Sequence, residues 1–395
     1  MKHPRSTKLN DRAFEVIPGG VSSRERKNLP HFSRYFDRGR GSHIWDVDGN
    51  EYIDYRNALG PVTLGYAYPA VVEAVGDQLA QGSVFGYPHP LEVEVAETLR
   101  EIIPCCRMVR FLKTGGEAMA AAIKAARATT GRDVVLRCGY HGWLQNTGEP
   151  GVPVSVSELL PSFAWGDVDG LAALLAAHEG RVAAISLAAS YPHITPDDAF
   201  LRDCRRLADD HDALLIFDEI VTGFRVALGG VQEYYDVTPD LAVFSKGMAN
   251  GLPVAALVGN QRAMRSLETA TVSSTFGGDA LGLAGARATI AVYRECDVVA
   301  HLWRMGRRLV DGANALFQEA GVPGRFRGCP TCPHLSFDSG NADRDRRLML
   351  GLMRALCRRG VTIYSVSYVN FSHQDPDIDE TLNRWHDAVR AGLDG

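Results

Sequence analysis

Between about residues 70 and 310, short apolar runs alternate with longer segments in which apolar residues recur at helical spacing. The runs are too short for helices and are nearly continuous, which is typical of strands buried on both faces of a sheet. Helical spacing is clearest at 117–129 and 280–295. This alternation predicts an α/β fold in which a mainly parallel sheet lies between helices. The predicted strands are 109–112, 134–136, 182–185, 213–217 and 241–244.

The pattern changes toward both ends of the chain. Residues 43–54 alternate around an Asp-Gly-Asn turn and predict a β-hairpin, whereas the first 40 residues are polar and predict no regular element. Toward the C-terminus, a helical segment (346–359) lies between two β-like stretches (334–337 and 361–369), which predicts a small α/β domain. The expected parts are an N-terminal segment (1–65) that packs with the small domain and a dimer partner, a large domain (66–310) and a C-terminal small domain (311–395).

Composition and charge narrow the class of protein. The 395 residues are 46% hydrophobic and 23% charged, with a formal net charge of −5, as is usual for a globular protein. The mild acidity and the lack of a basic block give no reason to expect nucleic acid as a partner. No apolar run approaches the roughly 20 residues of a membrane span, and the N-terminus lacks the apolar region of a secretory signal. We therefore expect a cytoplasmic protein with no membrane partner.

The eight cysteines lie mostly in apolar segments, where cysteine behaves as a small buried hydrophobe. Cys329 and Cys332 form a single CxxC motif, whereas a zinc ribbon needs a second pair of cysteines. The sequence therefore predicts no metal site and a reducing environment, which again favours the cytoplasm.

In sheets of this kind, ligands bind beyond the carboxyl ends of the strands, so the residues that follow each predicted strand matter most. After 109–112 come Thr114, Gly115 and Gly116 at the start of a helix. Free backbone N–H groups and the helix dipole favour a phosphate at such a place. An ordinary strand-to-helix turn would also contain these glycines.

Two further predicted strands end in an aromatic pair and in an acid. Tyr140 and His141 follow 134–136 and would either stack on a planar ligand or pack in the core. Asp218 ends the apolar run 213–217, where a buried carboxylate needs a partner. That partner would be a cation or a protonated ring nitrogen of a ligand, unless Asp218 caps a helix or forms a structural salt bridge.

A lysine follows the last predicted strand. Lys246 is one of only six lysines and comes one serine after the run 241–244. Desolvation in an apolar pocket disfavours the ammonium form, and the neutral amine can then form a Schiff base. A lysine that extends its charged head into solvent is the alternative.

Each of these signals is weak alone, but their order along one sheet is specific. A phosphate loop, an aromatic pair, a strand-end acid and a strand-end lysine together supply what pyridoxal 5'-phosphate (PLP) needs. The acid would keep the ring nitrogen protonated, and the lysine amine would bond to the aldehyde. The assigned residues are Thr114, Gly115 and Gly116 for the phosphate, Tyr140 for the ring face, Asp218 for the ring nitrogen and Lys246 for the aldehyde.

The same motifs resemble those of the class III PLP-dependent aminotransferases of fold type I, and most of all glutamate-1-semialdehyde aminomutase-like members. The resemblance runs over nearly the whole chain and is most specific around Asp218 and Lys246. It implies a large, mainly parallel sheet domain and a smaller α/β domain formed by the C-terminus and the N-terminal segment. The segments that carry the resemblance are 17–21, 46–49, 114–118, 140–142, 218–228, 245–247 and 377–379.

The resemblance also implies roles that the residues alone do not give. It includes His141 among the cofactor contacts and places Ile220 against the cofactor ring, opposite Tyr140. It further implies that Thr275 reaches the cofactor phosphate of a neighbouring subunit, so that the protein is a homodimer. The catalytic residues that it implies are Lys246, Asp218 and Tyr140.

The sequence departs from the aminomutases around the expected substrate. Their Gly-Ser-rich gating loop, which holds the intermediate while the amino group moves, is mostly missing after Gly142. A tryptophan expected before Gly60 is Leu59, and an asparagine expected near the phenolic oxygen of the cofactor is His193. Arg26 falls where the aminomutases bind a substrate carboxylate, although a solvated run of basic residues is the other interpretation. Arg26, Leu59 and His193 are therefore the substrate candidates, and glutamate-1-semialdehyde is not the expected substrate.

The predicted function is an aminotransferase that acts on small-molecule amine and carbonyl substrates. The bias toward arginine and alanine suggests a GC-rich genome and a role in specialised metabolism, with an amino sugar or aminocyclitol as the product. An isomerase, either an aminomutase or an epimerase at an amine-bearing carbon, is the alternative and would use the same lysine and acid. A non-catalytic protein that keeps the fold is a third hypothesis, which the intact Lys246 and Asp218 oppose.

Overall fold

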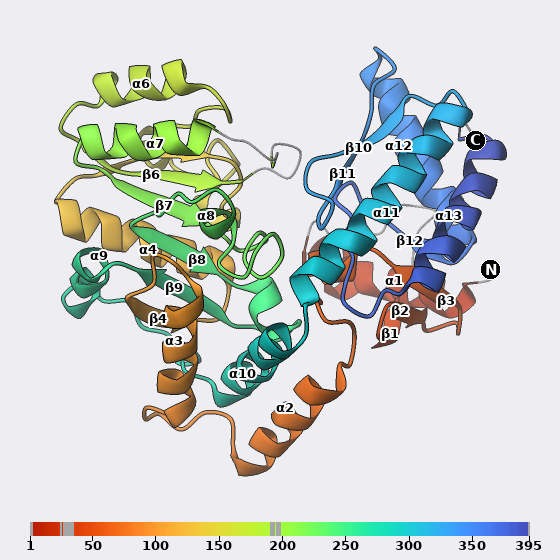
Figure 1. Ribbon diagram of the computed structural model, residues 1–395, viewed down its shortest axis with the longest axis horizontal. Coiled ribbons are helices and arrows are strands. Elements are labelled where there is room, and N and C mark those ends of the chain that lie inside the picture. The colour runs from red at the N-terminus through yellow and green to blue at the C-terminus, as the bar shows by residue number, and fades with distance from the viewer. Residues whose placement is uncertain (1–2, 24–25, 27–34, 190–193, 195–198, 394–395) are drawn as a thin grey trace. The chain divides into compact units, whose positions relative to one another are not determined.

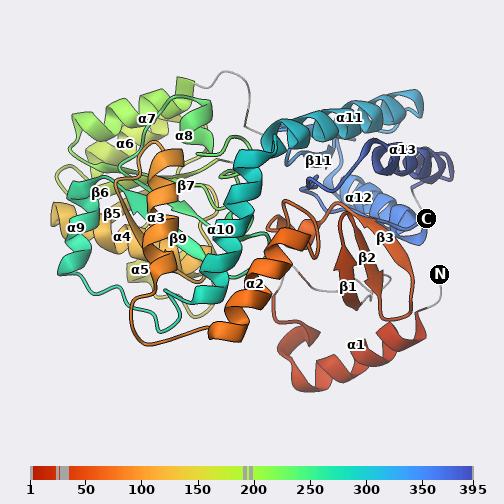
Figure 2. The same ribbon diagram turned by 60° about the horizontal axis from the view of Figure 1, so that its bottom comes forward.

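The computed structural model describes residues 3–23, 26, 35–189, 194 and 199–393, and the chain divides into two compact units (Figures 1 and 2). We call the unit that contains the larger sheet the large unit and the other the small unit. The domain boundaries predicted at residues 65 and 310 stay a prediction. The large unit comprises Gly60–Val62 and Pro69–Val299, and the small unit comprises Met1–Leu59, Thr63–Tyr68 and Ala300–Gly395.

The large unit contains a six-stranded sheet in the order β4-β9-β8-β7-β6-β5. Neighbouring strands from β5 to β8 are parallel, and β9 runs antiparallel to both β8 and β4, so that β4 has the same direction as the other four. All five predicted strands are confirmed. Their bounds are β4 (Met108–Leu112), β5 (Val134–Cys138), β6 (Val182–Ala188), β7 (Leu214–Asp218) and β8 (Leu241–Phe244), with β9 at Ala255–Gly259.

The core of the large unit forms where an alanine-rich helix, α4 (Gly115–Thr130), packs against the sheet. Ala118, Ala122 and Ala125 are fully buried against strand residues such as Ile216 and Val243. The small alanine side chains let the helix backbone approach the sheet closely, and burial of the apolar strand residues drives the contact.

The two helices predicted in this unit, 117–129 and 280–295, are confirmed as α4 and α10 (Ala280–Glu295). Asp279 caps α10, because its carboxylate accepts from the N–H groups of Leu281 and Gly282. The other helices of the unit are α2 (Pro69–Gln81), α3 (Pro90–Ile102), α5 (Val154–Glu158), α6 (Val168–Ala177), α7 (Ala199–Asp210), α8 (Val231–Tyr234) and α9 (Gln261–Arg265).

The small unit joins residues from both ends of the chain in one sheet of order β1-β2-β3-β12. The predicted hairpin is confirmed as β2 (His43–Asp46) and β3 (Glu51–Asp54), and β12 (Val361–Thr362) pairs with β3 in parallel. The predicted helix and strand near the C-terminus are confirmed as α12 (Ala342–Arg358) and β11. The remaining elements are β1 (Phe36–Arg40), β10 (Gly324–Arg327), β11 (His334–Phe337), α11 (Val298–Glu319), which begins in the large unit, and α13 (Asp375–Arg390).

Two sequence-based expectations for the small unit were wrong. The first 40 residues were expected to be irregular, yet Pro4–Val16 form the helix α1. Its first turn is capped from a distance, because the carboxylate of Asp48 accepts from the N–H groups of Arg5 (2.8 Å) and Ser6 (3.0 Å). In the second case, only Val361–Thr362 of the β-like stretch 361–369 form a strand.

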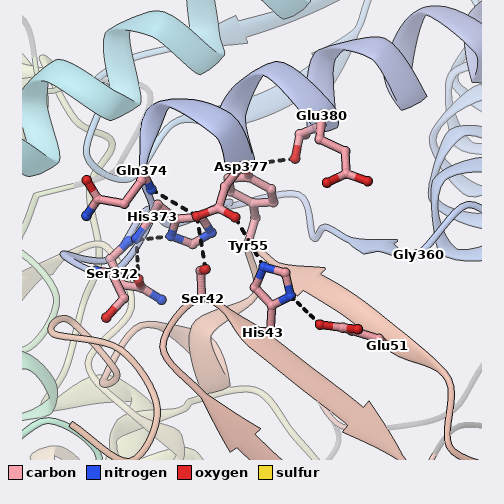
Figure 3. A network of polar contacts seen from close by, with 12 residues as sticks. Ser42, His43, Glu51, Tyr55, Gly360, Ser372, His373, Gln374, Asp377 and Glu380 are labelled. Atoms are coloured by element: carbon pink, nitrogen blue, oxygen red, sulfur yellow. Dashed lines mark hydrogen bonds and ion pairs between the residues drawn. The ribbon is translucent and has the colours of Figure 1, made fainter. Parts of the chain in front are cut away.

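A polar network joins the hairpin of the small unit to α13 (Figure 3). The ring of His43 lies between two carboxylates, with Nδ1 2.7 Å from Glu51 Oε1 and Nε2 3.1 Å from Asp377 Oδ1. Ser42 and the N–H of Gln374 donate to the other oxygen of Asp377. The hydrogen bond with Asp377 is the largest cause that raises the pKa of His43 above its usual value.

Several observations bear on other functional classes. Among the helices of the described chain, none is both long and apolar enough to cross a membrane.

Side chains of His3, Asp46 and Asp48 come within 4.8 Å of one another, as metal ligands do. However, the carboxylates already accept hydrogen bonds, from Asn50 and Tyr52 at Asp46 and from the first turn of α1 at Asp48. This cluster is therefore a hydrogen-bonded support for the hairpin and α1.

Candidate active site

The predicted site residues of the large unit gather at the carboxyl edge of its sheet. Because β4, β5, β7 and β8 have the same direction, the residues that follow them lie at one edge. Asp218 is the last residue of β7 and pairs with Val243 of the neighbouring β8, and Lys246 follows three positions later. Doubly wound sheets bind their ligands at this edge.

The turn after β4 presents unpaired backbone donors. Thr114 caps α4, and Glu117 completes a capping box that occupies the N–H groups of Lys113 and Thr114. Within the described part of the chain, the N–H groups of Gly115 and Gly116 have no hydrogen-bond acceptor. Two unpaired donors at the N-terminus of a 16-residue helix form a site that suits a phosphate.

Close backbone packing holds the neighbouring turns against this helix start. A Cβ atom on Gly115 would lie 2.4 Å from Cδ1 of Ile220, so the position requires glycine. On the other side, a Cβ on Gly142 would lie 3.0 Å from the Cα of Gly116, and Gly142 has a positive φ of 88°. The segments after β4, β5 and β7 are therefore in direct contact.

The aromatic pair after β5 splits into one exposed and one buried side chain. Tyr140 is 69% exposed, so its ring is accessible to a ligand. His141 is 1% exposed, and its Nδ1 lies 3.1 Å from Oδ2 of Asp218. The other oxygen of Asp218 accepts from the N–H of Ile220 at 3.1 Å. The buried carboxylate thus contacts one histidine ring and one backbone N–H group. There is no arginine or lysine among its described contacts.

Lys246 occupies a constrained backbone position. It opens a short 3-10 turn, Lys246–Ala249, and has a positive φ of 40°, which is unfavourable for a residue with a side chain. Ser245 fixes the turn by donating to the carbonyl of Val254 at 2.8 Å, and Gly247, Met248 and Ala249 are buried. The turn after β8 therefore fixes the backbone position of Lys246.

A buried acid next to Asp218, which sequence reasoning passed over, shapes the following loop. The carboxylate of Glu219 accepts from the hydroxyl of Thr222 and from the N–H groups of Val231 (2.9 Å) and Gln232 (3.1 Å). Burial raises the pKa of Glu219 to about 7, although these donors lower it in part. Glu219 thereby ties the loop that carries Ile220 to the start of α8.

The remaining predicted site residues lie in other parts of the chain. Thr275 is exposed in a turn beside β4, where Gly277 packs against the carbonyl of Phe111. Arg26 is exposed and Leu59 has a φ of 72°, and both belong to the small unit, so their relation to the site stays a prediction. His193 lies outside the described residues.

Comparison with known proteins agrees with the fold. The chain belongs to the class III aminotransferase family, whose profile matches residues 23–149 and 169–389. It is 35% identical over 407 residues to a 3-aminobutyryl-CoA aminotransferase of Cloacimonas acidaminovorans, covering 100% of this chain and 97% of the relative. It is also 35% identical over 430 residues to a glutamate-1-semialdehyde 2,1-aminomutase of Roseiflexus castenholzii, covering 99% and 98%.

A solved structure shows the same fold. The PLP internal aldimine form of the FumI protein of Sphingopyxis sp. MTA144 has a TM-score of 0.93 at 30% identity, covering 99% of this chain and 97% of that one. Class III aminotransferases are PLP-dependent enzymes, so the chain is a PLP-dependent enzyme of fold type I. The predicted family, fold class and cofactor are confirmed. The unpaired N–H groups of Gly115 and Gly116 and the buried Asp218 without a described lysine or arginine contact fit this cofactor.

Proposed function

We propose that the chain is an aminotransferase, which moves an amino group from a small-molecule amine to a separate carbonyl acceptor. The observation that carries the proposal is the short, fixed segment after Gly142. An enzyme that moves an amino group within one molecule must retain the intermediate, whereas a transaminase releases a product between its two half-reactions.

Arg137 of β5 holds this segment. Its side chain is 8% exposed, and its guanidinium donates to the carbonyl of Gln145, to Oγ1 of Thr147 (3.0 Å) and to the carbonyl of Leu160 (3.3 Å). These bonds draw the segment toward β5, while Gly142 packs against Gly116. A short segment held in this way has little freedom to fold over a substrate, which supports release of an intermediate product.

The residues of the large unit would divide the work as follows. Bound PLP supplies an electron sink for the substrate carbon from which a proton leaves. The amine of Lys246 would take that proton and return it at C4′ of the cofactor, and Asp218 would hold a proton on the ring nitrogen. The residues that would hold the cofactor are Thr114, Gly115, Gly116, Tyr140, His141 and Ile220, with Thr275 reaching the phosphate of the partner in a homodimer.

The substrate class is the finer part of the proposal. An amino sugar or aminocyclitol product is the class that the sequence suggests. A 3-amino thioester is the class that the name of the Cloacimonas relative adds. The carbonyl acceptors that would give these products, a keto sugar, a ketocyclitol or a 3-oxo thioester of coenzyme A, are larger than glutamate-1-semialdehyde, in agreement with the loss of the gating loop and the change at Leu59.

An isomerase is the second candidate, because an aminomutase is as similar to this chain as an aminotransferase is, at 35% identity. One experiment separates the aminotransferase from the isomerase. The purified holoenzyme is incubated with one amine at a time, and small molecules are then removed. The cofactor is extracted from the protein and identified by chromatography. We expect a donor to convert PLP into pyridoxamine phosphate, and a keto sugar, ketocyclitol or 3-oxo thioester to reverse the conversion. Rearrangement of a single substrate without any donor would instead establish the isomerase.

Lys246→Ala tests the assignment of the lysine. Because the variant lacks the amine that moves the proton, we expect no detectable turnover in the same assay, while the fold and a weakened affinity for PLP persist. Lys124→Ala, which changes an exposed lysine of α4, is the matched control and should keep full activity. Turnover by Lys246→Ala would refute the assignment.

A further inference from the structure

Ser186 is a buried hydroxyl in an otherwise apolar strand. Within β6, all of which is described, it is the only residue with a polar side chain, and it is 0% exposed. Its Oγ lies 3.4 Å from Nε2 of His141. Because a buried hydroxyl without a partner destabilises the fold, this contact with His141 offsets part of the cost of placing a serine in the strand.

His141 connects this hydroxyl to the acid of the site. Its ring is fully buried, with Nε2 toward Ser186 and Nδ1 toward Asp218 at 3.1 Å. A neutral imidazole has one N–H donor and one acceptor nitrogen, and an ionised carboxylate only accepts. The proton of the ring therefore belongs on Nδ1, and the lone pair on Nε2 requires a donor, which only the hydroxyl of Ser186 supplies among the described contacts.

We propose that Ser186 is a positioning residue for Asp218. Its hydroxyl donates to Nε2 of His141 and holds the ring in the tautomer and orientation in which Nδ1–H donates to Asp218. This inference rests on the proposed function, in which Asp218 faces the ring nitrogen of PLP.

The arrangement fixes the carboxylate on two sides without neutralising it. Oδ2 of Asp218 receives the N–H of His141, and Oδ1 receives the N–H of Ile220. Each carboxylate oxygen has two lone pairs, so a protonated ring nitrogen can still bind. In the proposed tautomer both chain donors are neutral, so the full negative charge stays available for that cation.

The experiment compares Ser186→Ala with the wild-type holoenzyme. Histidine side chains are labelled with ¹⁵N, and long-range ¹H–¹⁵N spectra report the protonation of each ring nitrogen, with His141→Gln identifying the signals of His141. The dissociation constant of PLP is measured in parallel by equilibrium dialysis. Thr289→Val is the matched control, because it removes a fully buried hydroxyl of α10 that has no partner in the described chain.

In the wild type we expect a protonated Nδ1 and a hydrogen-bonded Nε2. In Ser186→Ala the Nε2 signal should move to the position of an unbonded lone pair, and the PLP dissociation constant should rise about five- to tenfold, the effect of losing one hydrogen bond. Thr289→Val should change neither quantity.

An unprotonated Nδ1 in the wild type, an Nε2 signal that Ser186→Ala leaves in place, or an unchanged PLP dissociation constant would each overturn the inference. If Ser186→Ala does not fold, Ser186→Cys, which is similar in shape and slightly larger but donates only weakly, is judged by the same measurements. A purely structural role would lower thermal stability and leave the PLP dissociation constant unchanged. Failure of the proposed function is visible separately, in a wild type that runs no donor-dependent half-reaction.

Discussion

Two histidine–aspartate pairs in this molecule have the same separation and different surroundings. In the large unit, Nδ1 of His141 lies 3.1 Å from Asp218, and in the small unit, Nε2 of His43 lies 3.1 Å from Asp377. The side chain of His141 is 0% exposed and its second nitrogen faces the hydroxyl of Ser186. The side chain of His43 is 27% exposed and its second nitrogen faces another carboxylate.

The difference teaches that the second partner of the ring, rather than the distance to the aspartate, decides what such a pair does. Two carboxylates stabilise the imidazolium form, which raises the pKa of His43 and produces ion pairs that link β2 to α13. In the proposed tautomer of His141, the hydroxyl of Ser186 donates to Nε2 instead, and the charge of Asp218 stays available. The pair of the small unit supports the fold, whereas we propose that the pair of the large unit supports a ligand.

The largest expected effect separates the two aspartates. Asp218→Asn removes the charge that would keep the ring nitrogen protonated, so turnover should fall by about 100-fold or more, with the fold intact. Asp377→Asn should leave turnover within about threefold and lower the free energy of unfolding by about 1–3 kcal/mol, because it weakens the contacts with His43 and Ser42. Steady-state rates and urea unfolding of both variants check the contrast.

The contrast between the two pairs would be wrong if Asp218→Asn kept its turnover or if Asp377→Asn lost turnover instead of stability. Normal turnover in Asp218→Asn would mean that this acid does not face the cofactor, and the pair of the large unit would then be structural as well. An equally slow Asp377→Asn of unchanged stability would give the network of Figure 3 a part in catalysis.

An ion pair between the turn after β4 and the start of α10 extends the comparison to a pair in which both partners are fully charged. Nζ of Lys113 lies 2.5 Å from Oδ2 of Asp279, and the side chains are 18% and 13% exposed. Since Asp279 also caps α10, the pair holds the segment of Thr275 beside β4. In a double-mutant cycle of Lys113→Met and Asp279→Asn, the coupling in unfolding free energy should be about 1 kcal/mol.

The matched control is an exposed pair on α7, Arg206 with Asp210, at 58% and 56% exposure. Its coupling should be about 0.3 kcal/mol, because solvent screens both charges. Equal couplings in the two cycles would show that the Lys113 pair is as screened as the surface pair. Analytical ultracentrifugation of Lys113→Met adds a test of the homodimer, whose proposed contact at Thr275 the variant should weaken.

Much of the large unit follows from local signals in the sequence. The strands β4 to β8 are apolar runs with helical patterns between them. Each proposed cofactor contact except Thr275 lies at or just after the end of a strand or opens the next helix. β9 was missed because it returns antiparallel after only a 3-10 turn, without the helix that marks the other connections. The parallel part of the sheet, and with it the edge that holds the site, was therefore predictable.

What the sequence could not predict depends on partners that are distant along the chain. Ser186 contacts His141 45 positions away, and Lys113 binds Asp279 166 positions away. The cap of α1 comes from Asp48, more than 40 residues beyond the turn that it closes. The one local signal was Ser186 itself, since a hydroxyl in the middle of an apolar strand needs a partner.

The smallest expected effect is the dependence of stability on pH through His43. Its folded pKa is raised above the usual 6.5, so the stabilisation is fully present below about pH 6.5 and is lost as the pH rises through the folded value. The difference in unfolding free energy between wild type and His43→Gln should therefore be larger at pH 6 than at pH 9, by up to about 1 kcal/mol. Burial alone would raise the pKa of Asp377, but its hydrogen bonds with His43 and Gln374 lower it, so Asp377 stays ionised at pH 6. Urea unfolding at the two pH values measures the change. His386→Gln, at a half-exposed histidine of α13 with a single carboxylate 3.5 Å away, is the control that should show a smaller change. A difference that grows toward pH 9 would mean that His43 is neutral in the folded state, and the contrast between the two histidine–aspartate pairs would then rest on burial alone.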